Sequence, residues 1–526
     1  MPVLTFNLAD LTEAAVDRVP DRPALITPAR SLTYAELEAR ANRLAAWLAS
    51  KGIGPGDHVG CYMFNGTEYV ETMYAAFKLR AVPINVNYRY VEDELRYLFR
   101  DADLKALVHD AEFTPRIEAV RDGLPLLTTT LAVSGDSDSD YEKALAESSP
   151  ERVEVQRSGD DFYIIYTGGT TGMPKGVVWR QEDAFYSCFG GGDFTRANPV
   201  KTPDEMPERI GGTFMFFPLA PLMHGAAQWT VFAWLMGGGT NLLTASRPRT
   251  DYAEVWRLIS EHKVQVLTII GDAVARPLID EYKARPGEYD ASSLISIGSG
   301  GAPLSSAGRE ELATTFPHVI LNDGYGASET GAQARSFGGG KFASFDDETL
   351  VLDPETLEIV TAGSGGEGRV ARRGHIPLRY HNDPEKTAAT FVERDGERWV
   401  LTGDVATVLD DGSIQLLGRG SMCINTGGEK VFPEEVEGVL LGHPAVYDVI
   451  VVGVPDPRWG ERVTAVVQVT DGHALDRDTV VAHCRGQLAG YKVPRAVVTV
   501  ETVQRSPVGK ADYAWAKEVA IKEAEA

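Results

Sequence analysis

Cysteine is scarce in this chain, and neither long apolar runs nor a surplus of basic residues is present. The four cysteines, Cys61, Cys188, Cys423 and Cys484, show neither the paired spacing of a zinc site nor disulfide density. We therefore expect free thiols in a reducing, cytoplasmic compartment. No segment reaches the roughly 18 to 20 uncharged residues of a membrane span, and residues 1–10 carry no basic signal region. Stable membrane insertion is not expected.

Cations are outnumbered by anions, with 51 Lys and Arg against 75 Asp and Glu, so the formal net charge is −24. This charge repels polyphosphate backbones at long range, and nucleic acid is not an expected partner. A small nucleotide would have to be held by local donors. The 526 residues are 43% hydrophobic and 24% charged, which is typical of a soluble enzyme of two or three domains.

Helical and strand patterns alternate along the first third of the chain. The capping-box sequence Thr33 to Glu36 predicts a helix start, and further helices are predicted around residues 67–80 and 91–101. Strands are predicted at 59–63, 106–109, 162–166, 214–219, 264–270, 294–297 and 319–321. Because several of these strands lead into loops rich in Gly, Pro, Asp or His, the pattern predicts an α/β fold with ligand loops at strand ends.

A loop rich in glycine and threonine runs from Tyr166 to Gly176 after a predicted strand. Its glycines allow backbone N–H groups to approach an anion, its threonines add hydroxyl donors, and Lys175 adds a positive charge. The sequence therefore predicts a phosphate-binding loop, with an ordinary surface hairpin as the alternative. A Walker-type loop is excluded, because Pro174 precedes the lysine and Gly176 follows it where Ser or Thr is required.

A new pattern of strands and helices begins near Gly418 to Ser421. We predict a large domain over residues 1–419, built of packed sheets with helices, and a small α+β domain over residues 420–526.

Further motifs follow the loop in a fixed order, and together they carry a resemblance. They are Gly300 to Pro303, Gly324 to Glu329, Thr402 to Asp404, Gly418-Arg419, Gly427 to Lys430 with Pro433 to Glu437, and Pro507 to Lys510. Along essentially its whole length the chain resembles the adenylate-forming superfamily of acyl-CoA synthetases, luciferases and peptide-synthetase adenylation domains. This resemblance implies ATP, Mg²⁺ and coenzyme A as cofactor and substrates, a small-molecule carboxylic acid as partner, and a mobile small domain. It is also compatible with a homodimer.

The resemblance implies roles for particular residues. Lys510 matches the lysine that stabilises the adenylation transition state, Glu329 matches the magnesium ligand, and Thr171 matches a catalytic hydroxyl of the loop. As alternatives, Lys510 is a solvated tail lysine and Glu329 a surface carboxylate. The remaining residues implied to bind ATP or AMP are Thr167, Gly168, Gly169, Thr170, Gly172, Lys175, Gly301, Ala302, Pro303, Asp323, Gly324, Tyr325, Gly326, Ser328, Asp404 and Arg419.

An acid pocket and a coenzyme A site complete the implied set. The pocket residues are His224, Gly271, Asp272 and Gly300, although a lone histidine after an apolar run is as readily a packed residue. Small residues there leave room for a bulky acyl group. Gly427, Gly428 and Lys430 are implied to approach coenzyme A. In the family the hinge residue is usually Asp or Lys. This chain departs from that pattern, because Ser421 occupies the hinge position.

Three functions follow from these features. The first is an acid-CoA ligase, and Gly168 together with the run Gly176 to Arg180 is similar to an actinobacterial branch that acts on fatty and steroid side-chain acids. The second is an adenylating enzyme that loads a carrier protein. The third is a non-catalytic acyl or nucleotide sensor, which the presence of Lys510, Glu329 and Asp404 disfavours.

Overall fold

The first predicted helix starts where its capping box places it in this computed structural model. Helix α2 (Tyr34–Ser50) begins after Thr33, whose Oγ1 accepts from the Glu36 N–H while the Thr33 N–H donates to the Glu36 carboxylate at 2.8 Å. The structure describes residues 4–135, 138–167, 173–244, 247, 249–338, 340–426, 429–485, 487–506 and 509–525.

Two smaller sheets form the N-terminal part of the large domain. A parallel sheet has the order β4 (Val82–Asn85), β3 (His58–Tyr62), β5 (Leu104–Asp110) and β6 (Thr129–Val133). A second sheet has the order β18 (Arg379–Tyr380), β8 (Lys175–Arg180) and β7 (Phe162–Thr167), all antiparallel. Asn85 joins the two sheets, because its side-chain amide donates to the Tyr166 carbonyl and accepts from the Tyr166 N–H.

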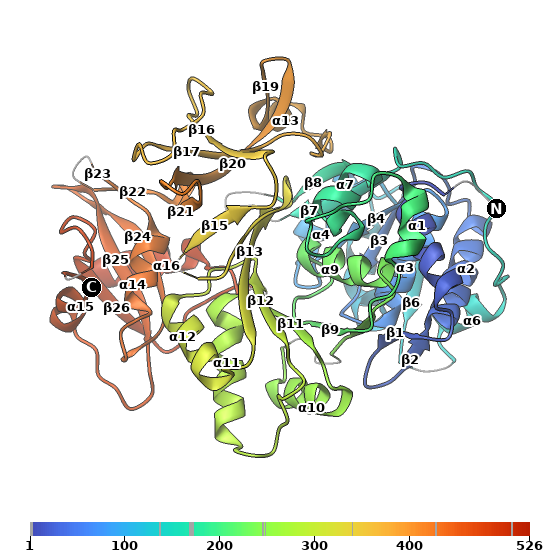
Figure 1. The fold of residues 1–526 in the computed structure, drawn as a ribbon, viewed down its shortest axis with the longest axis horizontal. Helices are drawn as coiled ribbons and strands as arrows, with labels where there is room; N and C mark the ends of the chain where they lie inside the picture. The colour runs from blue at the N-terminus through green and yellow to red at the C-terminus, as the bar shows by residue number, and fades with distance from the viewer. Residues whose placement is uncertain are drawn as a thin grey trace.

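The longest sheet crosses the centre of the molecule (Figure 1). Its order is β16 (Thr349–Leu352), β17 (Glu367–Arg372), β20 (Glu397–Val408), β21 (Ile414–Arg419), β15 (Lys341–Ser344), β14 (Gly331–Ser336), β13 (Ile320–Ala327), β12 (Ser296–Gly300), β11 (Val266–Ile269), β9 (Met215–Pro218), β10 (Thr240–Leu242), β1 (Pro23–Ile26) and β2 (Ser31–Thr33), with β19 (Phe391–Arg394) paired to β20. Strands β9, β11, β12 and β13 are parallel neighbours, so their carboxyl ends meet at one edge.

Helices cover the faces of these sheets, as an α/β architecture requires. In the large domain they are α1 (Leu8–Arg18), α2, α3 (Thr67–Lys78), α4 (Glu92–Asp101), α5 (Thr114–Arg121), α6 (Asp140–Ala146), α7 (Gln181–Ser187), α8 (Met206–Arg209), α9 (Gly225–Met236), α10 (Tyr252–His262), α11 (Gly271–Ala284), α12 (Ser306–Thr315) and α13 (Pro384–Thr390). The predicted α/β class and the predicted strands and helices of the first third are confirmed.

The small domain has its own sheet and its own apolar core. The strand order is β23 (Glu429–Val431), β22 (Ile424–Thr426), β25 (Gly460–Val469) and β24 (Val446–Asp456), with β26 (Ala496–Val500) paired to β25. Its helices are α14 (Pro433–Leu440), α15 (Arg477–Arg485) and α16 (Tyr513–Glu525). The domain lies beside α11 and α12 of the large domain (Figure 1).

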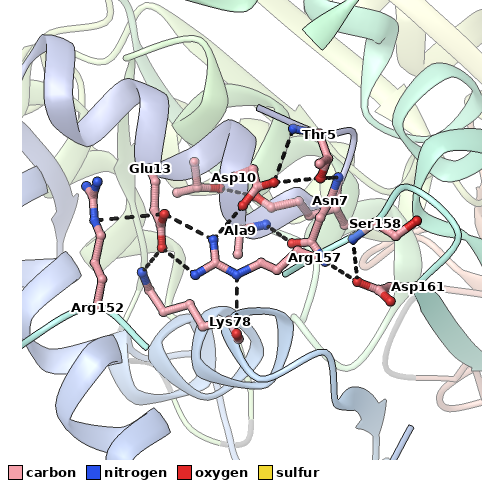
Figure 2. A network of polar contacts seen from close by, with 12 residues as sticks. Thr5, Asn7, Ala9, Asp10, Glu13, Lys78, Arg152, Arg157, Ser158 and Asp161 are labelled. Atoms are coloured by element: carbon pink, nitrogen blue, oxygen red, sulfur yellow. Dashed lines mark hydrogen bonds and ion pairs between the residues drawn. The ribbon is translucent and has the colours of Figure 1, made fainter. Parts of the chain in front are cut away.

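A buried ionic network ties α1 to α3 (Figure 2). Lys78, with a fully buried side chain, donates to Glu13 at 2.6 Å and to Glu38 at 2.8 Å. Arg157 donates to Glu13 and Asp10. Because the charges compensate one another inside the domain, the network holds the N-terminal helix against α3.

Two further features concern the cysteines and the helices of the described chain. All four cysteines are free, and three of them are buried. Among the described helices, none combines the length and the apolar character that a membrane crossing needs.

Candidate active site

The predicted ligand loops gather at the edge where β9, β11, β12 and β13 end. His224 follows β9, Gly271 follows β11, Gly301 follows β12 and Glu329 follows β13. The parallel registers, such as Gly300 opposite Gly324, hold these loops side by side. Residues more than a hundred positions apart in sequence therefore lie at one edge of the sheet, which is where open α/β sheets bind ligands.

Asp404 lies at the centre of a group of polar side chains from β20, β21 and β13. It lies opposite Arg419 in the β20–β21 register, and Arg419 Nε donates to Asp404 Oδ1 at 3.1 Å. The hydroxyl of Tyr325, on β13, donates to Asp404 Oδ2 at 2.8 Å. Burial and the Asp404 charge raise the pKa of Tyr325 well above its usual value, so its hydroxyl keeps the proton. A carboxylate held this way can still accept further hydrogen bonds, for example from a diol.

Glu329 is connected to the lysine of the glycine-rich loop through one short segment. The Tyr380 hydroxyl donates to Glu329 Oε1 at 2.8 Å, and the Lys175 ammonium lies 5.8 Å from the centre of the Tyr380 ring. Asp383 pairs with Lys175 at 3.0 Å. Strand β18 pairs with β8. This pairing holds the segment that carries Tyr380 and Asp383 against the strand that begins with Lys175. Glu329 keeps Oε2 for another ligand, and a hard oxygen suits Mg²⁺.

Lys510 reaches this group from the opposite end of the chain. The surrounding protein and the charge of Arg419 lower the pKa of Lys510, while Glu329 and Asp404 act in the opposite direction. Lys510 thus lies within electrostatic range of three residues of the large domain, although its side chain remains accessible to solvent. The structure brings together the lysine, the glutamate and the aspartate that the sequence predicted.

The hairpin that carries Lys510 is fixed on both sides. Arg505 forms two hydrogen bonds with Asp448, at 2.6 and 2.7 Å, and also donates to the Gly509 carbonyl at 3.0 Å. Gly509 has a φ of +68°, and a Cβ added there would come within 2.8 Å of the Ala273 Cβ. The hairpin therefore seats against the start of α11 at a point where only glycine fits.

His224 forms the N-cap of α9 and faces the same group. Its Nε2 is buried and makes no hydrogen bond within the part of the chain that the structure describes. Burial, followed by the charges of Lys510 and Arg89, lowers the pKa of His224 to about 3. His224 is therefore neutral at neutral pH, and Nε2 is free to contact a ligand. A role of His224 in the acid pocket, as against that of a packed residue, stays a prediction.

A pH dependence of stability follows for His224. In the unfolded chain its pKa is about 6.5, so between pH 6.5 and about 3 the unfolded state binds a proton that the folded state does not. The free energy of unfolding should therefore fall as the pH drops through this window. We expect His224→Gln to be less sensitive to acid, when urea unfolding is compared at pH 7 and pH 5. An equal loss of stability in both proteins would contradict this assignment.

Several other predicted residues have clear structural neighbours. Asp272 accepts from the Ser305 N–H, and a Cβ on Gly271, at a φ of +53°, would lie 2.2 Å from the Pro303 carbonyl. This packing joins the β11 and β12 loops, and a role of Asp272 in the acid pocket stays a prediction. Asp323 pairs with Arg309, and its Oδ1 is buried with no partner among the described residues.

Other predicted residues flank the site or lie outside the described chain. Thr167 and Lys175 lie opposite each other in the pairing of β7 with β8, so they flank the glycine-rich loop, whose phosphate-binding role stays a prediction. Residues 168–172, which include Thr171, and residues 427 and 428 lie outside the described residues. Ala302 and Pro303 follow β12, Gly326 lies on β13, and the Ser328 carbonyl accepts from Trp179 Nε1.

Lys430 lies away from Asp404 and Glu329, whereas the turn that contains Ser421 follows Arg419 directly and packs against the strand of Asp404. Ser421 lies in the single turn η4 (Gly420–Met422) between β21 and β22. Lys430 is exposed on β23, and β22 and β23 form the outer end of the small domain, well separated from β13 in Figure 1. In this arrangement the predicted coenzyme A residue and the predicted ATP residues do not share a site.

An apolar cavity of about 320 Å³ lies at the far end of α9. Phe185, Phe189, Phe194, Phe214, Ala233 and Trp234 are among its lining residues. The residues Ala226, Thr230, Ala233 and Gly237 follow one face of α9, because they recur every three or four positions. This small-residue face leads from His224 at the start of the helix to the cavity at its end.

The sequence does not single out Tyr380, Asp383, Arg505 or Asp448 as functional residues. Arg505 and Asp448 are 57 residues apart, and their pairing depends on how β24 meets the Lys510 hairpin. The sequence Arg505-Ser506 beside the Lys510 motif was the only available indication, and it does not name a partner.

Known proteins match this architecture along its length. The AMP-binding enzyme family model matches residues 12–376, and the model of the AMP-binding enzyme C-terminal domain matches residues 435–510. The 3-oxocholest-4-en-26-oate-CoA ligase of Rhodococcus rhodochrous is 46% identical, over 98% of this chain and 96% of that protein. The medium/long-chain-fatty-acid-CoA/3-oxocholest-4-en-26-oate-CoA ligase of Mycolicibacterium smegmatis is 45% identical, over 98% and 97%. The crystal structure of ATP-bound MatB from Rhodopseudomonas palustris superimposes with a TM-score of 0.83 at 26% identity, covering 97% and 98% of the two chains.

Proposed function

The chain belongs to the AMP-binding enzyme family, and from that membership we propose that it is an acid-CoA ligase that works in two half-reactions. In the first, a carboxylate oxygen of the acid attacks the α-phosphorus of ATP, and acyl-AMP forms as pyrophosphate leaves. In the second, the thiol of coenzyme A attacks the acyl carbon and loses its proton to solvent. The thioester forms, and AMP leaves with the oxygen that had bridged it to the acid.

The observation that carries this proposal is the position of Lys510 beside the Asp404 and Glu329 group. Attack of one anion on another builds negative charge between the carboxylate and the α-phosphate, and a fixed cation there stabilises the transition state. Because Lys510 comes from the small domain, it supplies this cation only while that domain is seated against α11. Binding of a nucleotide alone would not require it.

The remaining residues of the group supply binding contacts. Asp404 has the geometry to accept from both ribose hydroxyls, with Tyr325 and Arg419 fixing its carboxylate. The free Oδ1 of Asp323 offers an acceptor for an exocyclic amine such as that of adenine. Lys175, held by Asp383, adds a cation beside the glycine-rich loop for the outer phosphates.

Glu329 is the residue that would hold Mg²⁺. Its carboxylate is a hard ligand with one oxygen engaged by Tyr380 and the other available, which fits this ion. The bound ion would neutralise phosphate charge. The chain's own part is to keep Glu329 oriented toward the phosphates through the Tyr380 hydroxyl.

The second half-reaction requires a different position of the small domain. Lys430 lies at the outer end of that domain, so rotation about η4 is needed to bring residues 427–430 to the acyl-AMP. We propose the domain boundary between Arg419, the last residue of β21, and Gly420. Ser421 would then be the hinge.

The apolar cavity favours an acid with a long or bulky hydrocarbon part. The acyl carbon lies near His224, and a tail along the small-residue face of α9 would reach the cavity after a helix of 12 residues, about 18 Å at 1.5 Å per residue. Both relatives named above act on 3-oxocholest-4-en-26-oate, and one also acts on medium and long fatty acids. We propose the same substrate classes for this chain.

Substitution of Ala233 tests whether the hydrocarbon tail of the acid lies along this face of α9. Ala233→Phe would place a ring between the small-residue face and the cavity, so we expect kcat/KM to fall about 10-fold or more for long-chain and steroid acids. Activity with a short acid such as butyrate should change little. The measurement is pyrophosphate release across acids of increasing length. An equal loss for short and long acids would contradict this path.

The proposed function itself is tested by ATP-dependent pyrophosphate release with fatty, aryl and steroid side-chain acids, with and without coenzyme A. Release with one class of acid and recovery of its acyl-CoA thioester would support the ligase. Release that is indifferent to coenzyme A would favour the loading of a carrier protein, and no release with any acid would favour a sensor. The cytoplasmic location and the homodimer stay predictions.

A further inference from the structure

Arg276 projects from the large domain into the small domain. It lies on α11, whose start was expected to border the acid pocket. Its guanidinium donates instead to two backbone carbonyls of the small domain, that of Leu441 at 3.1 Å and that of Val446 at 3.2 Å. It also lies 5.9 Å from the centre of the Tyr447 ring. One side chain thus contacts three residues on the other side of the domain boundary.

These contacts are specific to one orientation of the small domain. Leu441 and Val446 flank the turn between α14 and β24, and Asp448, two residues later, is the residue that clamps Arg505 and the Lys510 hairpin. Three residues before Arg276 on α11, Ala273 packs against Gly509. Ala273 and Arg276 therefore lie on the same face of α11. Ala273 contacts the hairpin that carries Lys510, and Arg276 contacts the segment beside Asp448, which supports that hairpin.

We propose that Arg276 is a positioning residue that holds the small domain in the orientation in which Lys510 reaches the site. This inference rests on the proposed two-step function. The carbonyls of Leu441 and Val446 move with the small domain, so a rotation about η4 separates them from Arg276. Arg276 therefore stabilises the adenylating orientation and makes no such contribution to the rotated one. Removing it shifts the population toward other orientations.

The test compares an arginine within α11 with one just after its end. Arg276→Met keeps the aliphatic stem but removes the donors. Arg285→Met is the matched control, because Arg285 follows the end of α11, is exposed and pairs only with Glu281 and Glu288 among the described residues. We expect Arg276→Met to slow single-turnover adenylation about 10-fold or more. Thioester formation from supplied acyl-AMP and coenzyme A should be unchanged or faster. Arg285→Met should match the wild type in both.

A second readout does not depend on activity. Dyes placed at two exposed lysines, Lys283 on α11 and Lys522 on α16, report the domain orientation by energy transfer between single pairs. We expect one dominant population in the wild type and in Arg285→Met, and a second population in Arg276→Met. A single unchanged population would overturn the inference, as would an equal loss of both half-reactions. If the populations shift but the wild type adenylates no acid, Arg276 keeps its role and the proposed function fails.

Discussion

Lys510→Ala is expected to slow acyl-AMP formation by about 10²–10³-fold, the usual effect of removing one preorganised group that stabilises a developing charge. Lys510 lies within electrostatic range of Asp404, Glu329 and Arg419, where the α-phosphate of ATP would be bound. The measurement is single-turnover pyrophosphate release with saturating ATP and acid. The loss should appear in the rate rather than in the KM for ATP, because Asp404 and Lys175 still bind the nucleotide.

The second half-reaction provides the control for this prediction. When acyl-AMP and coenzyme A are supplied, Lys510→Ala should form the thioester at nearly the wild-type rate, because the small domain has rotated and Lys510 has left the site. A similar loss in both half-reactions would show that the substitution damages the domain. An unchanged adenylation rate would show that another group stabilises the transition state.

Lys78→Met is expected to destabilise the large domain by about 3–5 kcal/mol. The ammonium group of Lys78 is fully buried and pairs with Glu13 (Figure 2) and with Glu38. Its loss leaves two buried carboxylates with fewer partners. Arg157 and Arg152 still contact these carboxylates, which places the effect toward the lower end of that range. The measurement is the free energy of unfolding of the large domain from urea titration.

Lys283→Met is the matched control for the buried network. Lys283 pairs with Glu311 at 2.7 Å, but both side chains are well exposed, at 52% and 39%. Its loss should cost less than about 1 kcal/mol. The account of the buried network would be wrong if Lys78→Met were no less stable than this control.

Much of the fold could be predicted because its determinants are local. The capping box at Thr33 and the apolar runs that become β3, β5 and β7 depend on residues close in sequence. The position of Lys78 could not be predicted in this way. A lysine in the last turn of a helix usually stays in solvent, and only the packing of α1 and α2 against α3 encloses it.

The same difference between local and long-range determinants applies to the site. The motifs around Glu329, Asp404 and Lys510 were evident in the sequence, and the structure brings these residues into one group. The supporting contacts were not predictable, because Tyr380 reaches Glu329 only through the pairing of β18 with β8. The contacts of Arg276 with Leu441 and Val446 were not predictable either, because they depend on the orientation of the small domain.

If this chain activates an acid as an acyl-AMP, the fate of the carboxylate oxygen shows it most directly. An acid labelled with ¹⁸O in its carboxylate is incubated with the enzyme, ATP and coenzyme A, and the phosphorus-containing products are analysed by mass spectrometry. The account predicts AMP that carries one heavy oxygen and pyrophosphate that carries none. Label in inorganic phosphate, or AMP without label, would contradict it.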